Sequence, residues 1–311
     1  MTGTDLYKIR DFAADFDAIA AEFASRSRVL SARARMRTDI AYGTSPRETL
    51  DLIFPDNPTA DAPLHVFVHG GYWRSGEKAD YRFVAEPVLA AGGIAALVEY
   101  DLMPGQRLPV LVDQVRRAVL WLQQRARQFG ADPFRMTVSG HSAGAHLSSF
   151  LAATGPQEHA PSAVPAIRSM LLLSGIYDLS DIPDSFLRNE AQMTHSEAAA
   201  WSPLASVHDG GPQRFIAFGG DETAPFKDQA RALHDMIAGA AGAAELLPVP
   251  RSESYERCPG PWRPARLPWQ TPFGYGCFEL TFEQSCDKES GGGQVVAFTG
   301  TTKLPKARGR S

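Results

Sequence analysis

A serine lies at the centre of the segment Gly140-His141-Ser142-Ala143-Gly144, between a β-rich run and residues with helical spacing. A serine hydroxyl is a weak nucleophile, and hydrolases expose it on a sharp turn between a strand and a helix. The flanking glycines lack a Cβ, so strand and helix can approach each other closely beside Ser142. Gly-Ser turns also match this pattern by chance, but the strand and helix signals around it favour a functional interpretation. We therefore predict that Ser142 is a catalytic nucleophile.

A second motif, His-Gly-Gly-Tyr-Trp at residues 69–73, directly follows the apolar run 64–68. Attack on a carbonyl group places negative charge on its oxygen, and preorganised backbone amides stabilise that charge. The predicted donors of this oxyanion hole are the amide of Ala143, after the nucleophile, and those of Gly70 and Gly71. The alternative for the two glycines is an ordinary tight turn after a buried strand.

The larger side chains of this second motif carry a less specific signal. His69 is expected to be structural. Tyr72 and Trp73 are either core aromatics or the wall of a substrate pocket, because either role would bury them. We treat both as candidate pocket residues, and the sequence does not decide between the two roles.

Three stretches of the chain, HVFVHGGYWRSGEKADYRF, AAGGIAALVEYDLMP and VSGHSAGAHL, together resemble α/β-hydrolases of the arylformamidase (kynurenine formamidase) type. The resemblance runs from about Asp39 to about Val249. A Trp, Trp73, closes this oxyanion motif, in place of the third glycine of the lipase and esterase version, and this favours a formamidase over a general carboxylesterase. The resemblance implies cleavage of a small aryl formamide such as N-formylkynurenine to the amine and formate, in tryptophan catabolism, without a metal or organic cofactor.

The acid of a catalytic triad follows the serine in the chain order of this fold. Asp221 fits this place, because it follows the apolar run 214–218 through two glycines and so lies at the carboxyl end of an expected strand. It would orient the catalytic imidazole and stabilise its charged form. The alternative is a turn or helix-capping aspartate. Asp178 is the rival acid, and we expect it to be a loop or cap residue.

The triad histidine should follow the last strand, yet no histidine occurs after His234. His234 falls in a run with the spacing of a packing helix, so we expect it on a helix surface. His146 would lie one turn along the helix after Ser142, and we expect an ordinary helix histidine there. No triad histidine is therefore found, and the activity of this chain is expected to be impaired.

The composition changes near Pro250. Residues 1–250 contain 41 alanines and no cysteine, whereas residues 251–311 contain 3 alanines and all three cysteines. We predict a hydrolase domain over 1–250 that lacks its usual C-terminal histidine loop and helix, and an atypical tail over 251–311 that is frameshifted or disordered. A grafted binding tail is the alternative, and the coding DNA around codon 250, translated in all three frames, tests the prediction. Cys258, Cys277 and Cys286 follow no metal spacing, so no metal site is predicted.

The remaining chain predicts one α/β domain. With 311 residues and 44% apolar content it can bury a large core. Alternating strand and helix patterns predict an α/β-hydrolase fold, with a mostly parallel sheet covered by helices on both faces. The expected strands are 64–68, 94–100, 136–139, 170–174, 214–218 and 244–249, and the expected helices are 12–36, as a cap over the pocket, 110–129 and 227–238.

Charge and hydropathy restrict the partners. The net charge of −4 does not favour nucleic-acid binding, and the basic run 26–37 is better explained as a solvated face. The N-terminus is polar and the longest apolar run, 88–98, is too short to span a membrane. We therefore expect a cytoplasmic protein whose partner is a small-molecule substrate, with no nucleic acid or membrane, and a homodimer is left open.

Together these features predict an arylformamidase-like serine hydrolase that is impaired in this chain by the missing histidine. Two alternatives remain. One is a carboxylesterase of small esters. The other is a non-catalytic hydrolase relic or binding protein that keeps the pocket without the base.

Overall fold

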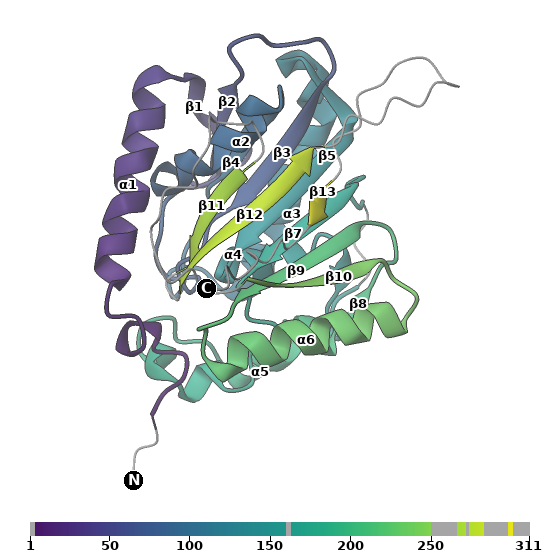
Figure 1. Cartoon of the computed structure of the whole chain (residues 1–311). Coiled ribbons are helices and arrows are strands. Elements are labelled where there is room, and N and C mark those ends of the chain that lie inside the picture. Colours follow the sequence, from purple (N-terminus) through teal and green to yellow (C-terminus); the bar gives the residue numbers. More distant parts are fainter. Residues whose placement is uncertain (1–3, 160–162, 250–265, 272–273, 283–297, 301–311) are drawn as a thin grey trace, which may run out of the picture.

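An eight-stranded sheet forms the centre of the computed structural model, which describes residues 4–159, 163–249, 266–271, 274–282 and 298–300 (Figure 1). The strand order is β1-β2-β4-β3-β5-β7-β9-β10. The first two pairs, β1 with β2 and β2 with β4, are antiparallel, and every later pair is parallel. These strands are β1 (Arg35–Ala41), β2 (Thr49–Phe54), β3 (Ala62–Val68), β4 (Ile94–Val98), β5 (Ala131–His141), β7 (Ser169–Leu173), β9 (Gln213–Gly219) and β10 (Ala244–Val249).

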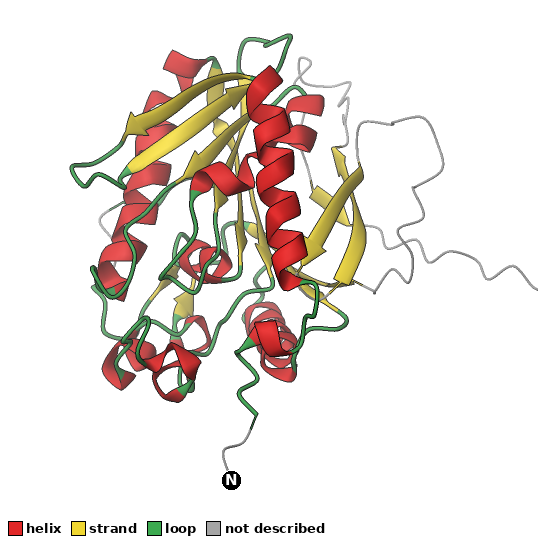
Figure 2. Ribbon diagram, turned by 90° about the vertical axis from the view of Figure 1, so that its left-hand side faces the viewer, coloured by secondary structure: helices red, strands yellow, loops and turns green. Residues whose placement is uncertain are grey.

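Helices cover both faces of this sheet, as Figure 2 shows. On one face α3, α4 and α6 pack against the sheet, and on the other face α1, α2 and η2 do so. The α-helices are α1 (Phe16–Arg33), α2 (Ala85–Ala90), α3 (Leu108–Arg125), α4 (Ala143–Ser149), α5 (His195–Ala200) and α6 (Ala224–Gly239). Short 3₁₀ helices are η1 (Ile9–Asp11), η2 (Lys78–Val84), η3 (Ala126–Phe129), η4 (Ile182–Asp184), η5 (Phe186–Arg188) and η6 (Pro203–Ala205). The predicted α/β-hydrolase fold is confirmed.

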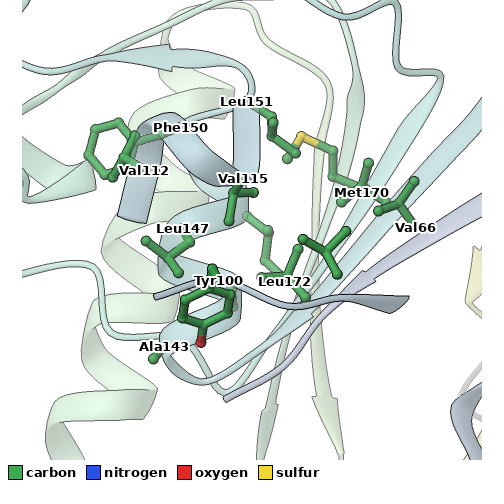
Figure 3. Close-up of a cluster of buried hydrophobic side chains, with 14 of the residues drawn as sticks. Val66, Tyr100, Val112, Val115, Ala143, Leu147, Phe150, Leu151, Met170 and Leu172 are labelled. Carbon is green, nitrogen blue, oxygen red and sulfur yellow. The ribbon is translucent and has the colours of Figure 1, made fainter. Parts of the chain in front are cut away.

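Alternation along the strands divides the core into two layers. Val66 and Val68 contribute to the layer under α3 and α4, whereas Phe67 faces the layer under α1 and η2. Figure 3 shows part of the first layer, where Leu147 of α4 lies among side chains of α3 and of the strands. Because the parallel strands are buried on both faces, they are almost uniformly apolar in sequence, and this made them predictable.

The structure differs from the sequence-based expectations at the N-terminal side. Strands β1 and β2 were not predicted, and the expected helix 12–36 ends at Arg33 because the next residues pair with β2. Long-range strand pairing here overrides the helical spacing of the basic run. The helix packs against η2, where the Phe23 ring lies 4.7 Å from that of Phe83.

Residues beyond 250 add a second, smaller sheet. The structure describes the backbone of β11 (Arg266–Thr271), β12 (Gly274–Phe282) and β13 (Phe298–Gly300), which pair antiparallel. These strands were not expected, because the tail shows no clear periodicity. The remainder of the predicted atypical tail lies outside the described residues, and its frameshift stays a prediction. A two-stranded ladder, β6 (Ala153–Thr154) with β8 (Val207–His208), completes the strands.

Candidate active site

Ser142 lies on a strained turn between β5 and α4. Its φ and ψ are 54° and −118°, a conformation that costs a non-glycine residue about 1–3 kcal/mol. The turn requires both flanking glycines: a Cβ on Gly140 would lie 2.3 Å from the carbonyl oxygen of Gly144, and one on Gly144 would lie 2.1 Å from that of Val68. Ser142 itself is only half-buried, whereas its neighbours are buried. The geometry is that of a nucleophile elbow.

The loop after β3 lies directly against this turn. Val68 is in register with Gly140, so residues 69–73 emerge beside the elbow. A Cβ on Gly70 would lie 3.2 Å from the Ser142 Cβ and 2.9 Å from the His141 carbonyl oxygen, so only glycine permits this approach. Gly71 has a φ of +126°, which also favours glycine. The structure therefore brings Gly70 and its neighbouring peptide to the serine, and Ala143 follows the serine as the first residue of α4.

The two aromatic residues of the loop are buried and hydrogen-bonded. Trp73 is fully buried, and its indole Nε1 donates to His146 Nδ1 over 3.0 Å. The Tyr72 hydroxyl donates to the backbone oxygen of Tyr7, and its ring meets that of Phe186 edge-on at 5.3 Å. The surroundings of Trp73 are those of a core residue that supports the loop. The pocket role of Tyr72 and Trp73 stays a prediction.

The N-terminal segment 5–7 lies across two loops at this edge of the sheet. The Tyr7 carbonyl oxygen accepts a hydrogen bond from the Tyr72 hydroxyl in the loop after β3. The Leu6 carbonyl oxygen accepts one from the Thr223 hydroxyl over 2.8 Å. The Tyr7 hydroxyl accepts from Gln229 of α6 over 3.0 Å. Segment 5–7, rather than α1, makes the contacts that we expected from an N-terminal cap.

Neither candidate histidine is placed to accept the serine proton. His146 uses both ring nitrogens, since Nδ1 accepts from Trp73 and Nε2 donates to the Trp201 carbonyl oxygen over 2.8 Å. Burial lowers the pKa of His146 to about 4, so the ring is neutral. His234 lies on α6, where it contacts Asp235 over 2.9 Å. Both histidines therefore have the helix roles that the sequence indicated.

The turn after β9 carries two adjacent carboxylates in opposite environments. Asp221 is exposed, whereas Glu222 is 1% exposed. Glu222 Oε1 accepts from the Ser174 hydroxyl over 2.6 Å and from the Gly219 amide over 2.8 Å. Its Oε2 is buried and has no hydrogen-bond partner in the described part of the chain. Burial raises the pKa of Glu222 to about 7, against the opposing effect of these two bonds. Asp178 accepts the Ser180 amide over 2.9 Å, as a loop residue does.

Consecutive strand ends connect Glu222 to the serine. The Ser142 amide donates to the Leu173 carbonyl oxygen at the end of β7, and the Ser174 amide donates to that of Ala217 in β9, both over 2.8 Å. Ser174 in turn donates its hydroxyl to Glu222. Glu222 is thus a buried carboxylate that is linked through Ser174 to the strand ends beside the elbow. The sequence predicted its neighbour Asp221 and not Glu222. The sequence has two neighbouring acids in one turn, and only their burial distinguishes them.

In the described residues, no three His, Cys, Asp or Glu side chains are grouped so that they could hold a metal ion. No described helix is both long and apolar enough to cross a membrane.

A serine elbow at the carboxyl end of a mostly parallel sheet, beside a glycine loop from the neighbouring strand, defines the α/β-hydrolase fold. Within this class the chain belongs to the BD-FAE family, whose model matches residues 50–237. The resemblance to α/β-hydrolases of the arylformamidase type is confirmed by the comparisons that follow.

Kynurenine formamidases and esterases are among the proteins similar to the chain. Kynurenine formamidase of Salmo salar is 34% identical over 169 residues, which cover 54% of this chain and 55% of that protein. Esterase LipQ of Mycobacterium tuberculosis is 29% identical over 236 residues, covering 68% and 56%. The thermophilic esterase Est2 of Thermogutta terrifontis is 25% identical with a TM-score of 0.56, covering 70% of this chain and 82% of that one. The chain thus spans about half the length of the curated relatives it matches.

Proposed function

We propose that this protein is a serine hydrolase that cleaves a small aryl formamide, of which N-formylkynurenine is an example. The observation that carries the proposal is the contact of Gly70 with Ser142 at a strained elbow. The substrate class is supported by the similarity to kynurenine formamidase and by the Trp that ends the loop motif. It follows that the pocket must accept a formyl group and an aromatic amine.

In the proposed reaction the Ser142 Oγ attacks the formyl carbon. The amides of Gly70, Gly71 and Ala143 stabilise the negative charge on the carbonyl oxygen. The amine leaves with a proton, and water then hydrolyses the formyl ester of Ser142 to release formate. The proton that the amine takes up is the one that the Ser142 hydroxyl gives up, and water returns a proton to Ser142 in the second step.

We assign the acid of the site to Glu222 in place of Asp221. A carboxylate that orients an imidazole needs a lone pair directed into the site, and Glu222 Oε2 is buried without a partner in the described residues. The chain has no histidine after His234 to meet it. Loss of the base in such a triad leaves only the contribution of the oxyanion hole and binding, about 10³- to 10⁴-fold over water. We expect slow turnover.

The test is hydrolysis of N-formylkynurenine with and without added imidazole, which can act as a diffusible base. We expect a slow reaction that imidazole accelerates in the native protein and not in Ser142→Ala. Ser149→Ala is the matched control, because Ser149 lies on the same helix, is buried and bonds to the Ala145 carbonyl oxygen. A rate that is unchanged in Ser142→Ala contradicts the assignment of the nucleophile.

A carboxylesterase is the second candidate, favoured by the similarity to LipQ and Est2. The two candidates differ in kcat/KM for N-formylkynurenine and for p-nitrophenyl butyrate. We expect the formamide to be preferred, because binding energy from its aromatic amine can be used in the transition state. Preference for the butyrate ester would identify an esterase, and Ser142-independent rates for both substrates would favour a binding protein.

A further inference from the structure

A buried histidine and a buried glutamate, His69 and Glu99, contact each other behind the loop that carries Gly70 and Gly71. Glu99 follows β4 as His69 follows β3, and the parallel register of Val98 with Val68 places the two side chains next to each other. His69 is fully buried and Glu99 is 6% exposed. Charged groups are rarely buried to this extent unless they are paired.

Both nitrogens of the His69 ring have an oxygen partner. Nε2 lies 2.8 Å from Glu99 Oε1, and Nδ1 lies 2.8 Å from the Gly70 carbonyl oxygen. The ring therefore links Glu99 to the peptide that follows Gly70. The Tyr100 ring stacks on the His69 ring at 4.3 Å.

Further donors hold the Glu99 carboxylate in place. Its Oε2 accepts the Lys78 amide over 2.9 Å, and Arg47 also contacts it while donating to the Gly76 carbonyl oxygen. Burial alone would raise the pKa of Glu99, but the His69, Lys78 and Arg47 interactions outweigh it and lower the pKa. Glu99 is therefore an ionised carboxylate that anchors both ends of the segment from 69 to 78.

These bonds fix the orientation of two peptide groups. In a planar trans peptide the carbonyl oxygen and the amide hydrogen point in opposite directions. The Tyr100 hydroxyl holds the His69 carbonyl oxygen over 2.7 Å, and the His69 ring holds that of Gly70. The amide hydrogen of Gly71 must then point away from the His69 ring. That of Gly70 points away from the Tyr100 hydroxyl and toward the hydroxyl of Tyr81, whose ring lies 6.1 Å from that of His141 beside the elbow.

We propose that Glu99, acting through His69, is a positioning residue that turns the amides of Gly70 and Gly71 toward the oxygen that becomes negatively charged on Ser142. This inference rests on the proposed function. Glu99 itself touches no reacting atom. Its removal should weaken binding of an oxyanion and leave binding of a neutral substrate analogue unchanged.

The test compares two ligands on the full chain. Phenylboronic acid adds to the serine as a tetrahedral anion whose oxygen occupies the oxyanion hole, whereas formanilide, an aryl formamide that this chain should turn over only slowly, binds as a neutral ground state. In Glu99→Gln we expect the Kd of phenylboronic acid to rise about tenfold or more, since losing one oxyanion donor outright costs about 10²- to 10³-fold in rate. The Kd of formanilide should change less than about twofold.

Two further variants make the result specific. Glu158→Gln is the matched control: Glu158 is paired with Arg116 of α3 and accepts the Gly155 amide over 3.1 Å, so the same substitution also removes a paired carboxylate, but in the loop after β6. Its Kd for phenylboronic acid should equal that of the native protein. Tyr100→Phe removes only the hydroxyl on the His69 carbonyl oxygen and should weaken phenylboronic acid selectively, even if Glu99→Gln does not fold.

Three outcomes would overturn the inference. If Glu99→Gln and Tyr100→Phe bind phenylboronic acid as tightly as the native protein, while Ser142→Ala loses binding, the positioning role is wrong and the proposed function stands. If both ligands weaken equally, Glu99 has only a structural role. If the native protein shows no binding that depends on Ser142, the proposed function fails together with the inference.

Discussion

Glu222 and Asp221 show that burial, rather than residue type, decides which carboxylate can serve a site. Both follow β9 within one turn, and Asp221 was predicted because it comes directly after two glycines. The buried neighbour instead accepts Ser174 and the Gly219 amide. Local sequence carries no information on which of two adjacent side chains faces inward once the strand has ended. The structure is needed to choose the acid.

Glu222 also makes stability depend on pH. Burial raises its pKa to about 7 in the folded protein, whereas an unfolded Glu titrates near about 4.3. Between these values the folded state binds more protons, so the free energy of unfolding falls as pH rises, by about 4 kcal/mol in total. In Glu222→Gln this contribution disappears. Relative to the native protein, the variant should therefore gain stability from about pH 5 to about pH 8.

Urea unfolding at both pH values measures this difference. Asp221→Asn is the control, since the exposed side chain should leave the free energy of unfolding close to native at either pH. Equal pH dependence of the native protein and Glu222→Gln would show that the buried carboxyl group does not titrate in this range.

At the scale of elements, the crossing of β5, α4 and β3 is the tightest part of the site. Gly144 lies against the backbone of Val68, so Gly144→Ala places a Cβ 2.1 Å from a carbonyl oxygen that cannot move without the strand. We expect a loss of about 3 kcal/mol or more of unfolding free energy. Gly239→Ala, near the end of α6 with open space around the new Cβ, should instead stabilise the protein by about 0.5–1 kcal/mol.

Thermal unfolding of the two glycine variants provides the measurement. Opposite shifts in Tm are expected from the same chemical change at two positions. A native-like Tm for Gly144→Ala would mean that helix and strand can separate at the elbow, and the geometric basis for the nucleophile would be weaker.

The elements differ in how well the sequence predicted them. The parallel strands were predicted because burial on both faces makes them apolar runs, and the two glycine motifs were predicted because their backbone conformations need glycine. Strand β1 was missed because it is an edge strand with a mostly exposed, polar sequence, and only its pairing with β2 defines it. The role of Glu99 was missed for a similar reason, since its partner His69 is adjacent only through strand register.

At the scale of the whole molecule, the N-terminal segment joins parts of the chain that are far apart in sequence. Tyr7 is 5% exposed, and its ring lies 6.1 Å from that of Phe226. Its hydroxyl accepts a hydrogen bond from Gln229, and its backbone oxygen accepts one from the Tyr72 hydroxyl. Tyr7→Ala should therefore lower the free energy of unfolding by about 3 kcal/mol. Lys8→Ala changes an exposed side chain and should stay within about 0.5 kcal/mol of native.

Chemical denaturation with both variants checks this prediction. If Tyr7→Ala is as stable as Lys8→Ala, segment 5–7 is not docked on the loops in solution. Loss of stability without a change in the Kd of phenylboronic acid would assign the segment a structural role alone.

The order of the strands also has a kinetic consequence. Gly70, Glu99, Ser142 and Glu222 come from the ends of β3, β4, β5 and β9, so the site contains residues about half the chain apart. Strand β9 joins the sheet through β7, which pairs with β5, and we expect such long-range parallel pairing to be slow because loop closure must precede it. An intermediate that contains only the strands up to β5 would possess the serine turn and the glycine loop but not the turn that carries Glu222. During refolding, the Glu222 environment should therefore form later than the elbow.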